Sequence, residues 1–350
     1  YDDVGTPSTI ANGGLSNDSQ PTVRGTLGAS AAGASLNADE FVAVYRSPDM
    51  SGLTSLNPSA NGNSGQLPST YRKVFFQVWD GNWIGTVTMP TSPQVNDIVG
   101  VYRNSSWGLT VMAGSTTLKV LGTSESAYYQ WDGTQWVNAV TYLGRAAITP
   151  VAGGQTTWEY TDTNTLASGV QVSYLAKLGD LAGNLGTNAW PNYSIIIDTT
   201  APAAVDLISG TPGVQATESQ YYNSGNAGAG KAIAPNVVLA SDTDIAQITV
   251  TVAGTADTTN DKLIFGTVTQ TLNTTAASGT NITINGITGV NWSYSAGKVL
   301  TLSKNGGGAF TAAQVQSIEQ GLQFQTSSGA TQGDRTFALA HVDLAGNTST

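Results

Sequence analysis

Two stretches of the chain, VSYLAKLGDLAGNLG (172–186) and TFALAHVDLAGNTST (336–350), can be superimposed without a gap. Asp180 of the first DLAGN then matches Asp343 of the second, at an offset of 163 residues. In both stretches apolar residues alternate ahead of an Asp, Gly and Asn cluster, a pattern typical of a strand that ends in a β-turn. An internal repeat at this spacing predicts two units of similar fold, each ending on this strand.

The sequence around these stretches predicts an all-β protein. Ile248 and Val250 alternate with polar residues, as in a strand with one buried face. The chain has 41 Gly and only 10% charged residues, and clusters rich in Gly, Asn and Ser separate the apolar runs. Short strands joined by such turns favour tandem β-sandwiches. One helix is expected near 311–321, because Thr311 followed by Gln314 is a capping-box pattern.

Charge and residue counts argue against several classes of protein. The net charge is -10, so nucleic-acid binding and attachment to anionic membranes are not expected. The chain has no Cys and a single His, which removes thiolate zinc sites and multi-histidine sites. His341 is expected to be a half-buried strand residue, and no enzyme activity is expected. No apolar run is long enough for direct membrane insertion, and no secretion signal precedes the first strand, so we expect a piece of a longer protein.

Several short phrases carry a family resemblance. DDVG (2–5), NGGLSNDSQPTVRGT (12–26) and DTTAP (198–202) resemble the bacterial Ig-like repeats of very long secreted adhesins of the RTX, biofilm-associated type. SDTDIAQITVTVAG (241–254) and FTAAQVQSIEQGLQFQTSSG (310–329) are similar to Ig-like or cadherin-like repeats of the same proteins. The resemblance implies tandem Ig-like sandwiches on the outside of a bacterial cell, with adjacent repeats of the same long chain as partners. It also implies that Ca²⁺ makes such repeats rigid.

The first of these domains is expected to be interrupted. In such repeats a strand like FVAVYR (41–46) is normally followed within a few residues by a strand like LGRAAI (143–148), but here a long segment separates them. Loops tolerate insertions when their ends stay close, so we interpret the segment as an inserted module. The predicted domains are residues 1–45 plus 143–200, the insert at 46–142, and a second Ig-like or cadherin-like domain at 202–350.

The predicted insert is rich in aromatic residues and holds five of the eight tryptophans. WDGNW (79–83) and WDGTQW (131–136) each place Asp-Gly between aromatic residues, which predicts two hairpins. The rings either build the core of a small module or form a platform for sugar rings or an apolar peptide. On the second interpretation Trp79 and Trp131 fix the hairpin register. The candidate ligand-binding residues are then Trp83, Trp107 and Trp136, with Asp80, Asn82 and Asp132 as polar neighbours.

Carboxylates gather near the expected ends of the domains. Hard oxygen ligands at a junction suit Ca²⁺, which takes about 6–8 of them. The alternative is that each DLAGN is a β-turn in which the Asp accepts backbone N–H groups and needs no metal. The candidate calcium ligands are Asp2, Asp3, Asp180, Asn184, Asp198 and Asp343.

The leading interpretation is a non-enzymatic, extracellular adhesin segment, in which a calcium-stiffened scaffold carries a module that binds a glycan or peptide of a host or neighbouring cell. One alternative is a purely structural extender whose insert is a spacer or a self-association module. The other is a glycan hydrolase housed in the insert. Exposed aromatic residues in a concave site of the insert favour binding, and a flat insert with all of its tryptophans buried favours the extender. Two carboxyl groups facing each other across a cleft favour the enzyme.

Overall fold

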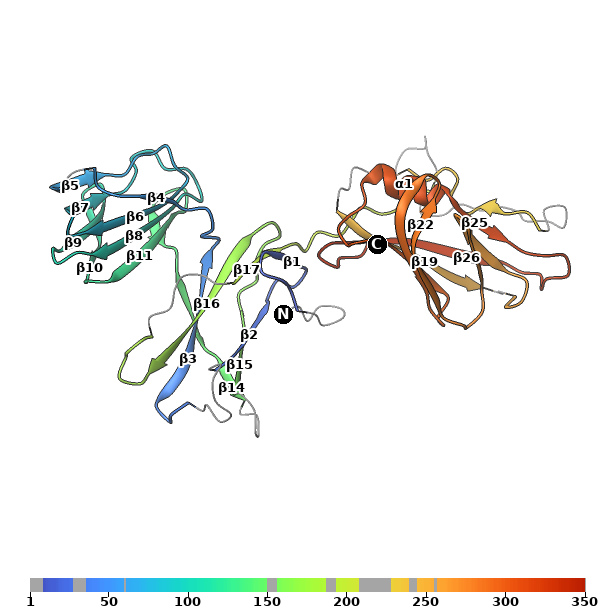
Figure 1. The fold of residues 1–350 in the computed structure, drawn as a ribbon, viewed down its shortest axis with the longest axis horizontal. Helices are drawn as coiled ribbons and strands as arrows, with labels where there is room; N and C mark the ends of the chain where they lie inside the picture. Colours follow the sequence, from blue (N-terminus) through green and yellow to red (C-terminus); the bar gives the residue numbers. More distant parts are fainter. Residues whose placement is uncertain are drawn as a thin grey trace. The chain divides into compact units, whose positions relative to one another are not determined.

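The computed structural model describes residues 9–27, 36–59, 61–149, 156–186, 193–207, 228–238, 244–254 and 257–349. The chain divides into two compact units, one made of Tyr1–Gly14 and Ser19–Ile197, the other of Leu15–Asp18 and Asp198–Thr350. Strands dominate both units, and α1 (Ala312–Gln320) is the one helix in the part that the structure describes. The all-β prediction is therefore confirmed (Figure 1).

The first unit contains a β-sandwich. Its larger sheet contains, in this order, β17 (Tyr193–Ile197), β16 (Gln171–Asp180), β3 (Glu40–Pro48) and β13 (Thr141–Arg145). The smaller sheet consists of β14 (Ala147–Thr149), β15 (Thr157–Thr161) and β2 (Thr22–Thr26). Val44 of β3 and Val172 of β16 pack in one core with Trp158 of β15, so the two sheets enclose a shared apolar layer.

A buried polar cluster also lies in this sandwich. Asp162, directly after β15, is fully buried and forms an ion pair with Arg46 of β3, with 2.6 Å between Nη1 and Oδ2. The hydroxyl of Tyr174 donates to the same carboxylate at 2.9 Å, and Asn164 donates to its other oxygen. Burial alone would raise the pKa of Asp162, but these hydrogen bonds and the Arg46 charge hold it below its ordinary value of 3.8.

Residues 49–140 lie between two adjacent strands of this sandwich. β3 ends at Pro48 and β13 begins at Thr141, and the two strands pair antiparallel, with Arg46 opposite Thr141. The chain therefore leaves the sheet and returns to it at neighbouring positions. We call residues 49–140 the inserted module.

The inserted module winds as a short solenoid. Strands β4 (Thr54–Leu56), β6 (Lys73–Trp79) and β8 (Ile98–Asn104) pair in parallel in one sheet, and β5 (Gly62–Gln66), β7 (Ile84–Thr88) and β9 (Leu109–Ala113) pair in parallel in the other. The chain alternates between the sheets, so residues 54–66, 73–88 and 98–113 form a first, second and third coil. Strands β10 (Thr116–Leu121), β11 (Glu125–Trp131) and β12 (Trp136–Asn138) complete the sheets in antiparallel pairings.

The two predicted hairpins of the module have different outcomes. Trp131 pairs with Trp136 across β11 and β12, with ring centroids 5.6 Å apart, so the second hairpin is confirmed. The first is wrong, because β6 ends at Trp79 and the following strand β7 belongs to the other sheet. Only a single bridge joins Trp79 to Asn82. Ile84 comes directly after this turn and is 3% exposed in the core between the two sheets. Its burial favours the path in which the chain passes from the first sheet to the second.

The second unit is a further sandwich. One sheet has the order β18 (Lys231–Ala232), β25 (Leu322–Gln325), β20 (Lys262–Phe265) and β21 (Val268–Thr271). The other has the order β22 (Ala277–Ile284), β23 (Ile287–Tyr294), β24 (Val299–Lys304), β19 (Ile245–Gly254) and β26 (Arg335–Asp343). Helix α1 begins after Thr311 with the predicted capping box, in which Gln314 N donates to Thr311 Oγ1 and Gln314 Oε1 accepts from Thr311 N. Val315 and Ile318 of the helix are buried in the core between the sheets.

His341 is more deeply buried than the sequence predicts. It is completely buried on β26, and its Nε2 lies 2.8 Å from Oε1 of the equally buried Glu319 on α1. Burial raises the pKa of the Glu319 carboxyl, and the hydrogen bond from His341 opposes that shift. The hydrogen bond between the two side chains connects α1 to β26, which is a structural role.

Candidate functional site

Trp83 and Trp107 form a stacked pair on the inserted module. Their ring centroids are 5.3 Å apart and the ring planes differ by 20°. Trp83 comes three residues before Thr86, and Trp107 comes three residues before Thr110. Thr86 of β7 and Thr110 of β9 are opposite each other. The two tryptophans therefore occupy the same position on the second and third coils. Trp83 is half-buried against the module core, whereas Trp107 is 57% exposed.

A carboxylate from the second coil holds the loop that carries Trp107. Asp80 Oδ1 accepts a hydrogen bond from Ser106 N at 2.6 Å and from Ser106 Oγ at 2.8 Å. These hydrogen bonds lower the pKa of Asp80, so the carboxylate stays ionised at neutral pH. The sequence analysis predicts Asp80 as a polar neighbour of the ligand. In the structure its carboxylate binds Ser106 and so holds the Trp107 loop in place.

Three other predicted ligand-binding residues have structural contacts. Trp136 is 7% exposed and lies in the core of the inserted module, which removes it from the binding surface. Its burial follows from its place opposite Trp131 in the second hairpin. Asp132 accepts from Thr134 N and Gln135 N inside that hairpin turn, and these bonds lower its pKa. Asn82 exchanges backbone hydrogen bonds with Trp79 in the turn after β6.

The two DLAGN sequences adopt the same turn. In the first unit Asn184 N donates to Asp180 Oδ1 at 2.9 Å and Asn184 Nδ2 to Asp180 Oδ2 at 2.7 Å. In the second unit Asn347 makes the corresponding bonds to Asp343, at 2.9 and 2.8 Å. Both hydrogen bonds from Asn184 lower the pKa of Asp180, and the one from its side chain has the larger effect. The β-turn interpretation therefore describes both copies.

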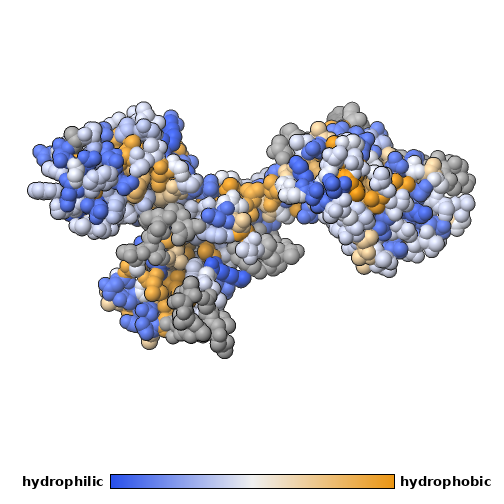
Figure 2. Space-filling view, viewed as in Figure 1, coloured by the Kyte–Doolittle hydropathy of each residue, from blue (hydrophilic) through white to orange (hydrophobic). Residues whose placement is uncertain are grey.

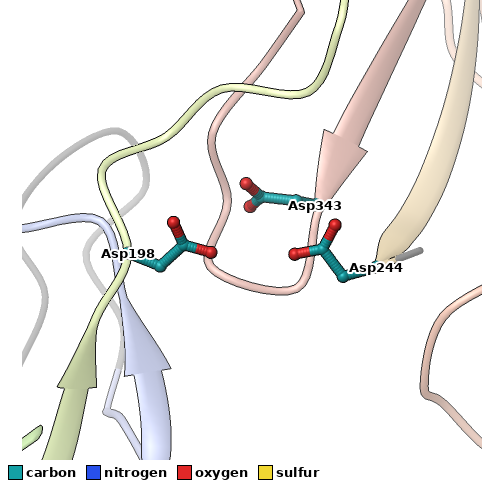
Figure 3. Close-up of side chains that lie close together, drawn as sticks. All are labelled: Asp198, Asp244 and Asp343. Atoms are coloured by element: carbon teal, nitrogen blue, oxygen red, sulfur yellow. The ribbon is translucent and has the colours of Figure 1, made fainter. Parts of the chain in front are cut away.

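Among the described residues, the second copy belongs to a cluster of carboxylates and the first does not. Asp198, Asp244 and Asp343 each offer an oxygen within 4.8 Å of the others (Figure 3). Asp198 follows β17, Asp244 precedes β19 and Asp343 ends β26, and all three carboxylates point toward a common space. Asp180 and Asn184 are not in this group, and the predicted ligands Asp2 and Asp3 lie outside the described residues.

The segment after Asp198 is also in contact with the DLAGN turn of Asp343. Asn347 Nδ2 donates to the backbone carbonyl of Asp198 at 2.7 Å, which ties the segment after Asp198 to the DLAGN turn. Three carboxylates that lie this close together could hold a hard cation such as Ca²⁺.

Asp244 is the member of the cluster that the sequence analysis missed. Its position is repeated in the first unit, because Leu344 N donates to Asp244 O and Leu181 N donates to Asp39 O, both from the residue after the turn Asp. Asp244 and Asp39 each directly precede a long central strand. The sequence did contain a signal for Asp244, because an Asp stands immediately before the strand that pairs with the DLAGN strand in both units.

Comparisons with known proteins give little further information. No family model and no curated protein matches the chain. Among solved structures, a chain described under "Structure of a chaperone-substrate complex" is similar over 25% of this chain and 16% of its own length, at 17% identity and a TM-score of 0.23. A similarity of this size carries no argument about fold or function. No helix among the described residues is long and apolar enough to cross a membrane.

Proposed function

We propose that this chain is a segment of an extracellular bacterial adhesin, in which the inserted module binds a neutral glycan through the face of Trp107. The observation that carries the proposal is the stacked pair, with Trp107 57% exposed on a half-buried Trp83. The flat face of an exposed indole suits stacking against an apolar ring face. Sugars meet this requirement without bringing a charge to a chain of net charge -10.

The position of the ring supports recognition. Trp83 beneath the ring and the Asp80 bonds to Ser106 hold the Trp107 loop before a ligand arrives, so less conformational entropy is lost on binding. One stacked ring contributes only about 1 kcal/mol, so useful adhesion depends on many copies of the protein at a surface. A long surface chain with adjacent repeats supplies such copies.

The carboxylates of the module favour binding over hydrolysis. A glycan hydrolase needs two carboxyl groups available to the substrate. All five carboxylates of the inserted module accept hydrogen bonds from neighbouring residues. These pairs are Asp49 with Lys73, Asp80 with Ser106, Asp97 with Arg72, Glu125 with Lys119 and Gly122, and Asp132 with Thr134.

Calcium belongs to this proposal as a structural ion of the second unit. The residues that would hold it are Asp198, Asp244 and Asp343. Three carboxylates within 4.8 Å repel one another, and a divalent cation offsets that repulsion. The ion would fix the segment at Asp198 against the DLAGN turn, which already binds it through Asn347.

The test is a glycan array probed with the whole chain, followed by calorimetry with each glycan that binds. Binding that is lost in Trp107→Ala and kept in the matched variant Trp158→Phe, which alters an aromatic residue of the sandwich core, supports the proposal. An array without signal would favour the structural extender. Binding that survives Trp107→Ala unchanged would move the glycan site to another surface.

A further inference from the structure

Arg103 occupies an interior position of the inserted module. It lies on β8 on the same face as Val99 and Val101, two residues of the module core. Arg103 is only 9% exposed. Its partner in the parallel pairing of β6 with β8 is Val78, which is completely buried. The third coil therefore has a guanidinium at a position where the second coil has a valine.

This guanidinium has few polar contacts for a buried charge. Its Nη1 donates to Leu121 O at 2.6 Å, and its Nη2 donates to Ser106 O at 3.3 Å. Its Nε is buried and has no hydrogen-bond partner among the described residues, and none of their carboxylates forms an ion pair with it. Burying a charge without a paired opposite charge costs stability, whereas an apolar side chain costs none. Core packing alone would therefore favour a valine in the third coil as well.

One of the two hydrogen bonds reaches the Trp107 loop directly. Ser106, the residue before Trp107, accepts from Arg103 through its carbonyl and donates its N–H and its hydroxyl to Asp80. The hydrogen bonds from Ser106 are the main cause that lowers the pKa of Asp80, and the positive charge of Arg103 lowers it further. Ser106 is therefore bound by both a cation and an anion, which limits the rotation of the backbone next to Trp107.

The other hydrogen bond connects the two ends of the loop. Arg103 lies near the end of β8, the strand before the loop. Leu121 ends β10 and is opposite Leu109, which begins β9 directly after the loop. β8 belongs to one sheet of the module, and β9 and β10 belong to the other. By binding Leu121 O, the Arg103 side chain joins the two sheets at the place where the loop passes between them.

We propose that Arg103 is a positioning residue of the glycan site, which keeps the Trp107 ring stacked on Trp83 before a ligand arrives. The two coils differ in the way that explains its presence. Trp83 packs against the module core, so packing holds its ring, whereas Trp107 is 57% exposed and depends on its loop. The inference rests on the proposed glycan function, but the position of the Trp107 ring can be measured without a glycan.

Arg103→Met tests this role, because methionine keeps much of the length of the side chain and removes the guanidinium. Two stacked indoles give an exciton couplet in the circular dichroism spectrum, and the Trp131 and Trp136 pair contributes a second couplet. Subtracting the spectrum of a Trp107→Ala variant from that of its parent isolates the part that depends on Trp107. This difference couplet is expected in the wild type and should be largely lost in the Arg103→Met background.

Lys119→Met is the matched control. It also removes one positive charge from the inserted module, but Lys119 is 42% exposed and pairs with Glu125 at the surface, so the difference couplet should equal that of the wild type. Urea unfolding finds conditions in which each variant is folded. A purely structural role for Arg103 would lower the stability and leave the couplet of the folded protein unchanged. If Arg103→Met does not fold, Arg103→Lys replaces it, because lysine keeps the charge without the fork of two donors and should give a reduced couplet.

Calorimetry with an array-positive glycan completes the test. Arg103→Met should weaken binding between about twofold and tenfold, because the ligand must then order a loose ring. Three results would overturn the proposal: a wild type without a difference couplet, a folded Arg103→Met variant with an unchanged couplet, and a lost couplet with unchanged glycan affinity. A lost couplet together with an array that gives no signal would support the positioning of the ring by Arg103 and refute only the glycan function.

Discussion

Trp107 on the third coil stacks on Trp83, which has the same position on the second coil, with 5.3 Å between the ring centroids. The two rings have different surroundings, since Trp83 packs against the module core and Trp107 is 57% exposed. Figure 2 shows the visible face of the inserted module, at upper left, as mostly hydrophilic with a group of hydrophobic residues among them. Trp83 therefore supports the pair from the core side, and Trp107 is the ring that faces solvent.

Trp107→Ala should remove glycan binding and leave the stability of the module nearly unchanged. The exposed ring contributes little buried area, so a stability change within about 0.5 kcal/mol is expected. Calorimetry with an array-positive glycan and urea unfolding measure the two quantities. A large loss of stability would show that the ring is a core residue, contrary to its exposure.

Trp136→Ala should have the opposite profile. Trp136 is 7% exposed in the module core, so its truncation should destabilise the protein by about 3–5 kcal/mol. Urea unfolding followed by a probe within residues 49–140 measures the change. A loss below about 1 kcal/mol would mean that the indole is not packed as the structure shows.

Calcium should raise the melting temperature of the second unit. A ligand present at about 100-fold its Kd adds about 2.7 kcal/mol, so excess EGTA should lower the melting temperature. Asp244→Asn should abolish the difference between calcium and EGTA. Asp180→Asn is the matched control, because Asp180 has the same turn contacts but is outside the cluster. Equal melting curves for the wild type in calcium and EGTA would refute the ion.

The buried Asp162 should make the stability of the first unit sensitive to acid. Its pKa in the folded state is lower than its ordinary value of 3.8, so its contribution is complete above pH 3.8. That contribution is lost as the pH falls below 3.8, because the unfolded chain takes up the proton first. Urea unfolding of wild type and Asp162→Asn should differ most near neutral pH and converge in acid. A constant difference at every pH would assign the effect to packing alone.

Glycine is required in both DLAGN turns. Gly183 and Gly346 each have a φ of +94°, in the region that residues with a Cβ rarely adopt. Gly183→Ala and Gly346→Ala should each destabilise their own unit by about 1–2 kcal/mol. Gly62→Ala, at an ordinary φ with open space around it, is the control and should have little effect. Circular dichroism during heating measures all three.

The sequence predicts those features that depend on local patterns. The capping box at Thr311 and Gln314 requires two side chains three residues apart, and the structure contains it. The hairpin at Trp131 and Trp136 likewise follows from one short motif. The shared geometry of the two DLAGN turns could be read from the repeat, because the same five residues make the same bonds to one another.

Features that depend on distant pairing were missed. WDGNW predicts a hairpin locally, but burial of Ile84 between two sheets decides where the chain goes after Asn82. The parallel coils had a sequence signal, since Trp83, Thr86 and Val87 recur 24 residues later as Trp107, Thr110 and Val111. Asp244 was missed because its neighbours in the cluster come from two other elements.

The pairing of Arg46 with Thr141 has a mechanical consequence. Tension that pulls apart the two points where the inserted module joins the sheet would act first on the hydrogen bonds between β3 and β13, because these strands pair next to those points. The module stays outside the path of the tension as long as those bonds hold. In the adhesin that we propose, the surface around Trp107 would therefore keep its shape for as long as the pairing of β3 and β13 holds.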